Sequence, residues 1–307
     1  MTLLRIVIFL SFSCLLLFYP GNSWIIHSFS QRNTWTKVAV EPKRLANHPI
    51  PIVALGPFPS VSAEGVFVTD LTSFTPLLDR NSRQKFFPAS TAKIITALVV
   101  ADVFQPTDVI TIKNAITQEE RPDWQLMGLT TGERITVENL LYGILVHSAN
   151  DAAVAVADAY GYDAFITKMN EKAVMLHMDN SYFKNPDGID EQGQLTSPFD
   201  LALAARALLK NSYLAKFVST KEITISDVDY THFHTLNNVN KLLGEVNGIG
   251  GLKTGYTELA GQNLVSFYKK NGNQYIIVVL KSADRFADTK TITQWVDQNI
   301  SFVPMPL

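Results

Sequence analysis

Short hydrophobic runs, each bounded by polar turn residues, lie near both ends of the chain. Residues 65–70 and 76–79 are rich in β-branched and large apolar side chains, and Thr72-Ser73 separates them. Similar runs return late in the chain, over residues 251–255, 262–268 and 275–280. Runs of this kind predict strands, and the segment 269–272 (KKNG) predicts a hairpin turn between the last two.

The middle of the chain carries longer hydrophobic runs that predict helices. Residues 92–101 are apolar almost all round, so this helix should lie inside the protein rather than on its surface. A last helix is expected over residues 287–298. The elements therefore run from strands through helices to strands again, closed by a helix.

Capping residues mark the starts of four more helices. Thr136 can cap a helix that runs to residue 147, and Ser197, which proline follows, can cap one that runs to residue 210. Asp151 is expected to cap a third helix, to about residue 160. The fourth should start at Asp163, with an apolar face formed by Phe165, Ile166, Met169, Ala173 and Val174.

This order of elements predicts an α+β fold. An antiparallel sheet would be assembled from both ends of the chain and packed with helices, and a helical subdomain over about residues 105–212 would be inserted between them. Residues 24–60 contain five prolines and should be a linker or an irregular extension. We therefore expect one domain over residues 61–303, which leaves no room for a further C-terminal β-domain.

Residues 1–23 have the character of a targeting segment. Arg5 precedes an apolar run that ends at Tyr19, and small and polar residues follow. A run of about fourteen residues suits the core of a signal peptide better than a membrane span, which needs about twenty. An uncleaved N-terminal anchor remains the alternative, and either predicts export.

Composition excludes several classes of protein. The chain has 307 residues and a formal net charge of −2, with no long basic run, so nucleic-acid binding is not expected. Its single cysteine, Cys14, allows neither an intramolecular disulfide nor a cysteine zinc site. His232 and His234 alternate as in a strand without an obvious carboxylate companion, so we predict no metal site there.

Candidate chemistry begins at Ser90 and Lys93, at the head of the buried helix. Their spacing places a hydroxyl and an amine on one helix face, near a helix N-terminus. A helix cap followed by a surface lysine is the alternative interpretation. However, a lysine at the start of a buried helix is costly unless it is paired or neutral, which favours a functional role.

Two further short patterns strengthen that hypothesis. Ser148 and Asn150 lie at the junction of two predicted helices, where a simple capping turn is the alternative. Lys253, Thr254 and Gly255 lie in a predicted strand, where a protective edge lysine is the alternative. Together the three patterns match the active-site set of serine β-lactamases and penicillin-binding proteins.

The chain resembles the D-alanyl-D-alanine carboxypeptidases, the low-molecular-mass penicillin-binding proteins, over roughly residues 62–300. Supporting stretches are residues 131–133, 136–141, 148–153, 169–170, 185–188, 253–257 and 260–261. The resemblance implies a β-lactamase-like fold and removal of the terminal D-alanine from peptidoglycan stem peptides, without a metal or organic cofactor. β-Lactam antibiotics would be covalent inhibitors, and the enzyme would act outside the cytoplasm.

The resemblance also implies a role for each motif residue. Ser90 would be the nucleophile, Lys93 its base, made neutral by burial and by the nearby charge of Lys253, and Ser148 a proton relay. Asn150 would bind the substrate's amide chain. Lys253 and Thr254, together with Thr257, would hold the terminal carboxylate. Gly255 would let the substrate lie along the strand, and Tyr256 would share an oxyanion hole with Ser90.

Some features depart from the family pattern or leave alternatives open. Asp187 stands where the family often has histidine, which puts a local role of this position in doubt. A class A β-lactamase is disfavoured because no Glu-x-x-x-Asn pattern occurs around residues 185–191. A DD-endopeptidase and a non-catalytic peptidoglycan-binding protein remain as alternatives, and stem-peptide preference stays open.

Overall fold

The computed structural model describes residues 7–8, 10–11, 49–54 and 56–303. Most of the predicted targeting segment at 1–23, including Cys14, lies outside these residues, as does much of the range 24–60. Within the described part of the chain, no helix is both long and apolar enough to span a membrane. Residues 49–54 and 56–303 belong to one compact unit.

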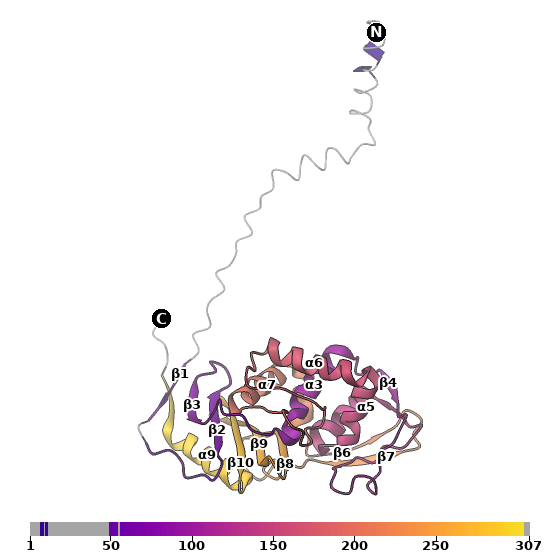
Figure 1. Cartoon of the computed structure of the whole chain (residues 1–307). Coiled ribbons are helices and arrows are strands. Elements are labelled where there is room, and N and C mark those ends of the chain that lie inside the picture. Colours follow the sequence, from indigo (N-terminus) through magenta and orange to yellow (C-terminus); the bar gives the residue numbers. More distant parts are fainter. Residues whose placement is uncertain (1–6, 9, 12–48, 55, 304–307) are drawn as a thin grey trace. The chain divides into compact units, whose positions relative to one another are not determined.

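A five-stranded antiparallel sheet forms the centre of this unit (Figure 1). Its strand order is β3-β2-β10-β9-β8, so the N-terminal hairpin pairs with the C-terminal strands through β2 and β10. The bounds are β2 Gly65–Asp70, β3 Pro76–Arg80, β8 Ile249–Thr257, β9 Gly261–Lys270 and β10 Asn273–Ser282. The prediction of an antiparallel sheet built from both chain ends is therefore confirmed.

Helices and short two-stranded ribbons complete the fold. A 3₁₀ turn, η2, leads into the buried helix α3, and a π-helical turn, η3, continues α4. The bounds are η2 Ala89–Ala92, α3 Lys93–Val103, α4 Val137–Tyr142, η3 Gly143–His147, α5 Asn150–Tyr160, α6 Tyr162–Met175, α7 Pro198–Lys210, α8 Ser212–Val218 and α9 Arg285–Asn299. The ribbons pair β4 Val109–Thr111 with β5 Arg134–Thr136, and β6 Glu222–Ser226 with β7 Phe233–Asn237.

Two hydrophobic clusters lie on opposite faces of the sheet. On one face, Phe67, Val265 and Ile276 belong to a cluster that includes buried residues of α3, α5, α6 and α7, and α7 contacts β2 and β10. On the other face, Val66 and Ile277 pack with Trp295 and its neighbours on α9. Strand residues that alternate between two covered faces explain why the central strands read as continuous hydrophobic runs.

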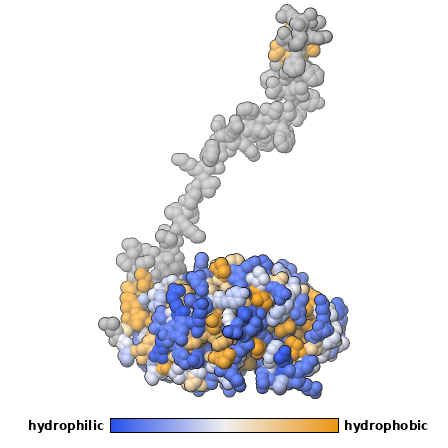
Figure 2. Space-filling view, in the orientation of Figure 1, coloured by the Kyte–Doolittle hydropathy of each residue, from blue (hydrophilic) through white to orange (hydrophobic). Residues whose placement is uncertain are grey.

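A strand at residues 50–53 corrects the expectation of an irregular extension there. β1 (Ile50–Val53) pairs with β11 (Ile300–Val303) directly after α9. Pro51 is tolerated because an edge strand leaves some backbone N–H groups unpaired, so the N–H that proline lacks is not needed there. Figure 2 shows an apolar area around β1, where Ile50, Ile52 and Val303 are exposed.

Two helix predictions were wrong in detail. Asp151 does not cap α5, which follows Ala149; its carboxylate instead accepts backbone N–H groups of an earlier loop. Val174 does not belong to the apolar face of α6, because 75% of it is exposed. Phe165, Met169 and Ala173, four residues apart, form the buried stripe, and Val174 lies beside it.

The predicted caps at two other helices are confirmed. The Thr136 hydroxyl accepts the Asn139 N–H at the start of α4, and the Ser197 hydroxyl accepts the Asp200 N–H at the start of α7. The region 105–212 contains α4 to α7, as predicted, but residues 105–136 form no helix and include the β4–β5 ribbon instead.

Candidate active site

A cleft of about 440 Å³ opens beside the edge strand β8. All three predicted motifs contribute to its wall, through Ser90, Ser148 and Thr254. The complete lining is Ser90, Gln118, Pro122, Asp123, Trp124, Gln125, Ser148, Val239, Thr254, Gly255, Tyr256 and Arg285. Segments that lie far apart in the sequence thus meet at one surface opening.

Ser90 is held by a strained and closely packed backbone. Ala89 has a φ of 48°, in the left-handed region that alanine rarely adopts. A Cβ on Gly188 would lie 1.9 Å from the Ala89 carbonyl oxygen, and a Cβ on Gly255 would lie 3.0 Å from the Ser90 nitrogen. These two glycines therefore let two chain segments approach η2 and fix the position of Ser90.

Lys93 lies one turn from Ser90, as its spacing predicted, and is completely buried. Its Nζ lies 2.9 Å from Ser90 Oγ, 2.6 Å from Asn150 Oδ1 and 2.6 Å from the Asp187 carbonyl oxygen. A neutral amine has two N–H donors and one lone pair. The amide and carbonyl oxygens can only accept, so they use both donors and leave the lone pair facing Ser90 Oγ.

Burial lowers the pKa of Lys93 to about 8, although the charges of Asp187 and Asp151 act in the opposite direction. At pH 7 such an amine is neutral in about a tenth of the molecules. The expectation that burial promotes a neutral Lys93 thus agrees with this shift. The expected contribution of Lys253 is not among the causes; two buried carboxylates oppose the shift instead.

Ser148 and Lys253 form a second hydroxyl–amine pair in the cleft. Lys253 Nζ donates to Ser148 Oγ over 2.7 Å, and Ser148 itself has a left-handed φ of 64°. Burial lowers the pKa of Lys253 well below its ordinary value, and the charges of Lys93 and Arg285 add to this effect. Lys253 is 1% exposed, so it is no protective surface lysine, although β8 is an edge strand.

Two strand residues have different surroundings from those we expected. Gly255 gives room to η2, because a Cβ there would also lie 2.9 Å from the Ala89 Cβ. Thr257 does not line the cleft: its hydroxyl donates to Asp190 over 2.7 Å and accepts the Ala260 N–H. The predicted contact of Thr257 with a substrate carboxylate is therefore not supported.

Sequence reasoning missed Arg285, the first residue of α9. Its Nη1 donates to the Gly255 carbonyl oxygen over 2.7 Å, and the residue lines the cleft beside Thr254. No motif marks this arginine, because it reaches the site from an element some thirty positions after β8. The neighbouring Asp284 cap, which fixes the start of α9, was the one available sequence signal.

A loop over residues 118–125 forms the opposite wall and was also missed. The Asn150 N–H donates to the Gln125 carbonyl oxygen over 2.7 Å, which ties this loop to the second motif. Asp151 holds the next residues through the N–H groups of Met127, Gly128 and Leu129. The acid next to the motif asparagine therefore shapes the cleft without lining it.

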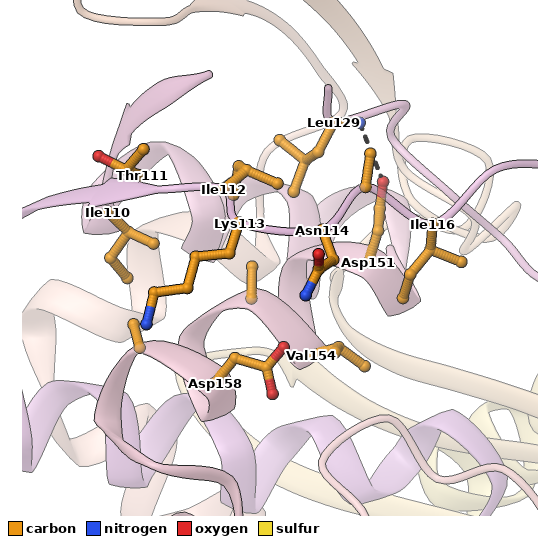
Figure 3. Close-up of a pocket in the computed structure, with 13 residues that line it drawn as sticks. Ile110, Thr111, Ile112, Lys113, Asn114, Ile116, Leu129, Asp151, Val154 and Asp158 are labelled. Carbon is orange, nitrogen blue, oxygen red and sulfur yellow. Dashed lines mark hydrogen bonds between the residues drawn. The ribbon is translucent and has the colours of Figure 1, made fainter. Parts of the chain in front are cut away.

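A second cavity lies on the other side of Asp151, between β4 and α5 (Figure 3). Lys113 and Asp158 extend into it, and Asp151 is hydrogen-bonded at one end. Its volume of about 30 Å³ is far below the 440 Å³ of the cleft at Ser90. The cleft at Ser90 is thus the better candidate for a substrate.

His232, just before β7, and His234, within β7, both have carboxylate partners, contrary to expectation. His234 Nε2 lies 2.7 Å from Glu133 Oε1, and His232 Nδ1 lies 3.4 Å from Asp227 Oδ2. These acids come from loops that the sequence pattern did not pair with the strand. Among the described residues, no three His, Cys, Asp or Glu side chains are placed to hold a metal ion.

Comparison with known proteins identifies the family. A family profile described as D-alanyl-D-alanine carboxypeptidase matches residues 54–284. The chain belongs to the D-alanyl-D-alanine carboxypeptidase family. Carboxypeptidase DacF of Bacillus subtilis is 33% identical over 72% of this chain and 58% of its own length. Carboxypeptidase DacA of Escherichia coli is 32% identical over 77% of this chain and 61% of its own length.

Solved structures of the carboxypeptidase family share the fold. The Streptomyces K15 DD-transpeptidase has a TM-score of 0.74 and 29% identity, over 79% of this chain and all of that one. A D-alanyl-D-alanine carboxypeptidase from Mycobacterium tuberculosis has a TM-score of 0.73 and 25% identity, over 82% and 99%. The α+β, penicillin-binding-protein fold is thereby confirmed. This chain spans about three fifths of the length of DacF and DacA.

Proposed function

We propose that this chain is a serine-type D-alanyl-D-alanine carboxypeptidase that removes the terminal D-alanine from peptidoglycan stem peptides. The observation that carries the proposal is the environment of Lys93, whose lone pair faces Ser90 Oγ when its two N–H groups serve Asn150 and Asp187. Membership of the carboxypeptidase family supports the substrate class.

Acylation uses Lys93 as the base. Neutral Lys93 takes the hydroxyl proton as Ser90 Oγ attacks the carbonyl carbon between the two D-alanines. The backbone N–H groups of Ser90 and Tyr256 stabilise the resulting oxyanion, a contribution of about 3 kcal/mol to the barrier when donors are well placed. The close approach of β8 to η2 at Gly255 supports this pairing of donors.

The terminal carboxylate of the substrate binds at the positively charged end of the cleft. Thr254 and Arg285 line this end, and Lys253 lies buried behind it. An arginine fork can bind a carboxylate through two parallel hydrogen bonds. We therefore assign the carboxylate to Arg285, Thr254 and Lys253. Asn150 Nδ2, which has no hydrogen-bond partner among the described residues, donates to the peptide chain of the substrate.

Departure of D-alanine requires a proton on its amine. Ser148 supplies it from its hydroxyl and regains one from Lys253, to which it is hydrogen-bonded. The peptide C–N bond breaks, and the peptide remains as an ester on Ser90. The proton that Lys93 took from Ser90 then passes through water to Lys253, which restores a neutral Lys93 and a protonated Lys253. Lys93 next takes a proton from the water that attacks the ester, and it returns this proton to Ser90 Oγ as the ester C–O bond breaks.

Transpeptidation is the second candidate, because the K15 neighbour of this fold is named a DD-transpeptidase. The acyl-enzyme would be the same, but an amine of another stem peptide would attack it in place of water. Incubating a D-Ala-D-Ala pentapeptide with and without an amine acceptor separates the two. A carboxypeptidase yields D-alanine and the shortened peptide, whereas a transpeptidase yields a new amide.

We also propose that the enzyme acts outside the cytoplasm and is acylated by β-lactam antibiotics. Its substrate class lies in the cell wall, and the apolar run before residue 20 suits an export signal or an N-terminal anchor. Any membrane attachment would pass through residues 1–23. Fractionation of cells that express the full chain tests this, and recovery from the cytoplasm in mature, active form would contradict it.

Measured release of D-alanine from a pentapeptide ending in D-Ala-D-Ala tests the proposed activity directly. The wild-type chain should release D-alanine, and Ser90→Ala should release none. Thr91→Ser, which retains the hydroxyl that donates to the Pro88 carbonyl oxygen and changes no proposed catalytic group, is the matched control. Cleavage of a crosslinked dimer without release of D-alanine would instead indicate an endopeptidase.

A further inference from the structure

The cleft carries opposite charges on its two walls. Arg285 marks one wall, with Lys253 buried behind it. Asp123, on the facing loop, is the only carboxylate among the described residues that line the cleft. A substrate whose reacting end is anionic and whose upstream part is cationic would match both walls.

The loop that presents Asp123 is held in one shape. Gln118 Nε2 donates to the carbonyl oxygens of Arg121, Pro122 and Trp124, over 3.0, 2.7 and 3.2 Å. The Arg121 guanidinium lies 5.0 Å from the centre of the Trp124 ring, so its charge is directed toward that ring. A wall fixed in this way loses little conformational entropy when a ligand binds.

The carboxylate of Asp123 is free to bind a ligand. In the described part of the chain it forms no ion pair and no side-chain hydrogen bond. Its neighbour Glu120 differs, because that carboxylate accepts the N–H and hydroxyl of Thr117 and closes a turn. Trp124, beside Asp123, and Tyr256, on β8, add aromatic surface to the same opening. Such surface suits the aliphatic stem of a side chain that ends in an amine.

We propose that Asp123 determines specificity by binding a free ammonium group on a side chain upstream of the D-Ala-D-Ala end. The inference rests on the proposed function, because that function places the carboxylate of the substrate at Arg285. The expected substrate class is a stem peptide whose diamino acid has an unmodified amine. Acylation or crosslinking of that amine removes the charge and weakens binding.

Equilibrium binding to the Ser90→Ala protein tests the proposal without turnover. Two pentapeptides ending in D-Ala-D-Ala are compared, identical except that the side-chain amine is free in one and acetylated in the other. The free-amine peptide should bind about two- to fivefold more tightly, the range of a solvent-exposed ion pair. The ratio should fall toward one as salt is raised.

Asp123→Asn in the same background should abolish this preference by weakening only the free-amine peptide. Glu119→Gln, which removes an exposed acid of the same loop that does not line the cleft, should preserve it. A preference that survives Asp123→Asn, an equal loss for both peptides, or no preference in the parent protein would overturn the proposal. D-Alanine release by the Ser90 enzyme is measured separately, so failure of the proposed activity remains distinguishable.

Discussion

Lys93 Nζ and Asn150 Oδ1 lie 2.6 Å apart, in a contact that joins the first motif to the second across 57 positions of sequence. Because an amide oxygen can only accept, this contact fixes the direction of one Lys93 N–H bond. The asparagine thus helps to aim the lone pair of Lys93 in addition to binding substrate.

Replacement of Asn150 by alanine should slow acylation of Ser90 by penicillin about 10- to 100-fold, the range expected for loss of one hydrogen bond to an ionisable amine. Stopped-flow acylation rates measure the effect. Asn170→Ala, at a distant asparagine that bonds backbone atoms of Ile166 and Phe183, controls for loss of stability. An Asn150→Ala rate equal to that of the wild type would contradict the orienting role.

The fall in acylation rate at low pH, the acid limb of the pH–rate profile, should be set by protonation of Lys93. Its active form is the neutral amine, so the rate should fall as pH drops below a pKa of about 8. The charge of Asp187 raises that pKa. Asp187→Asn should therefore move the limb to lower pH, by up to about one unit, and speed acylation at pH 6.

Rates of acylation measured from pH 5 to 9 check this shift. Asp163→Asn, at the exposed start of α6, is the control and should leave the limb in place. A limb that does not move in Asp187→Asn, or that moves to higher pH, would show that Asp187 does not act on the charge of Lys93.

A methyl group at position 255 should disturb Ser90 more than it disturbs the fold. The Gly255→Ala Cβ would lie 2.9 Å from the Ala89 Cβ, closer than carbon atoms normally approach. We expect a loss of about 1–3 kcal/mol of stability and an acylation rate at least about tenfold lower.

Gly272→Ala is the matched comparison for that loss of stability. Gly272 has a φ of 81° and open space around it, so alanine there strains a remote hairpin without touching the cleft. Thermal unfolding and acylation are measured on both variants. Equal acylation rates at equal stability would mean that the close approach of β8 to η2 does not position Ser90.

Arg285→Ala should raise KM for the D-Ala-D-Ala peptide about tenfold or more, because it removes a guanidinium at the carboxylate end. Arg134→Ala, which breaks an exposed ion pair with Asp229, should leave KM unchanged. Steady-state kinetics give KM for both variants. An unchanged KM in Arg285→Ala would remove Arg285 from the carboxylate site.

Local sequence patterns predicted the features that depend on neighbouring residues. The three-residue spacing of Ser90 and Lys93 determines that they share a helix face, and the apolar run after them indicates burial. The strands of the sheet could also be predicted, because short hydrophobic runs and the turn residues between them are local features of the sequence. The family resemblance implied that the three motifs form one active site, which no local pattern could indicate.

Features that depend on long-range contacts could not be predicted in this way. Arg285 reaches the cleft only because α9 packs against β10 and against β9, the strand that pairs with β8. Glu133 meets His234 across 101 positions, and β1 becomes a strand only by pairing with β11. Asp151 lies at a position typical of a helix cap, but its carboxylate accepts the backbone N–H groups of residues 127–129 instead.

We propose Ser90 as the nucleophile and Lys93 as the base that activates it. Labelling with a tagged penicillin, followed by mass-spectrometric peptide mapping, tests these two roles most directly. We predict one adduct, on the peptide that contains Ser90, which is absent in Ser90→Ala and slowed by orders of magnitude in Lys93→Ala. An adduct on another residue, or equal labelling of Ser90→Ala, would contradict the account.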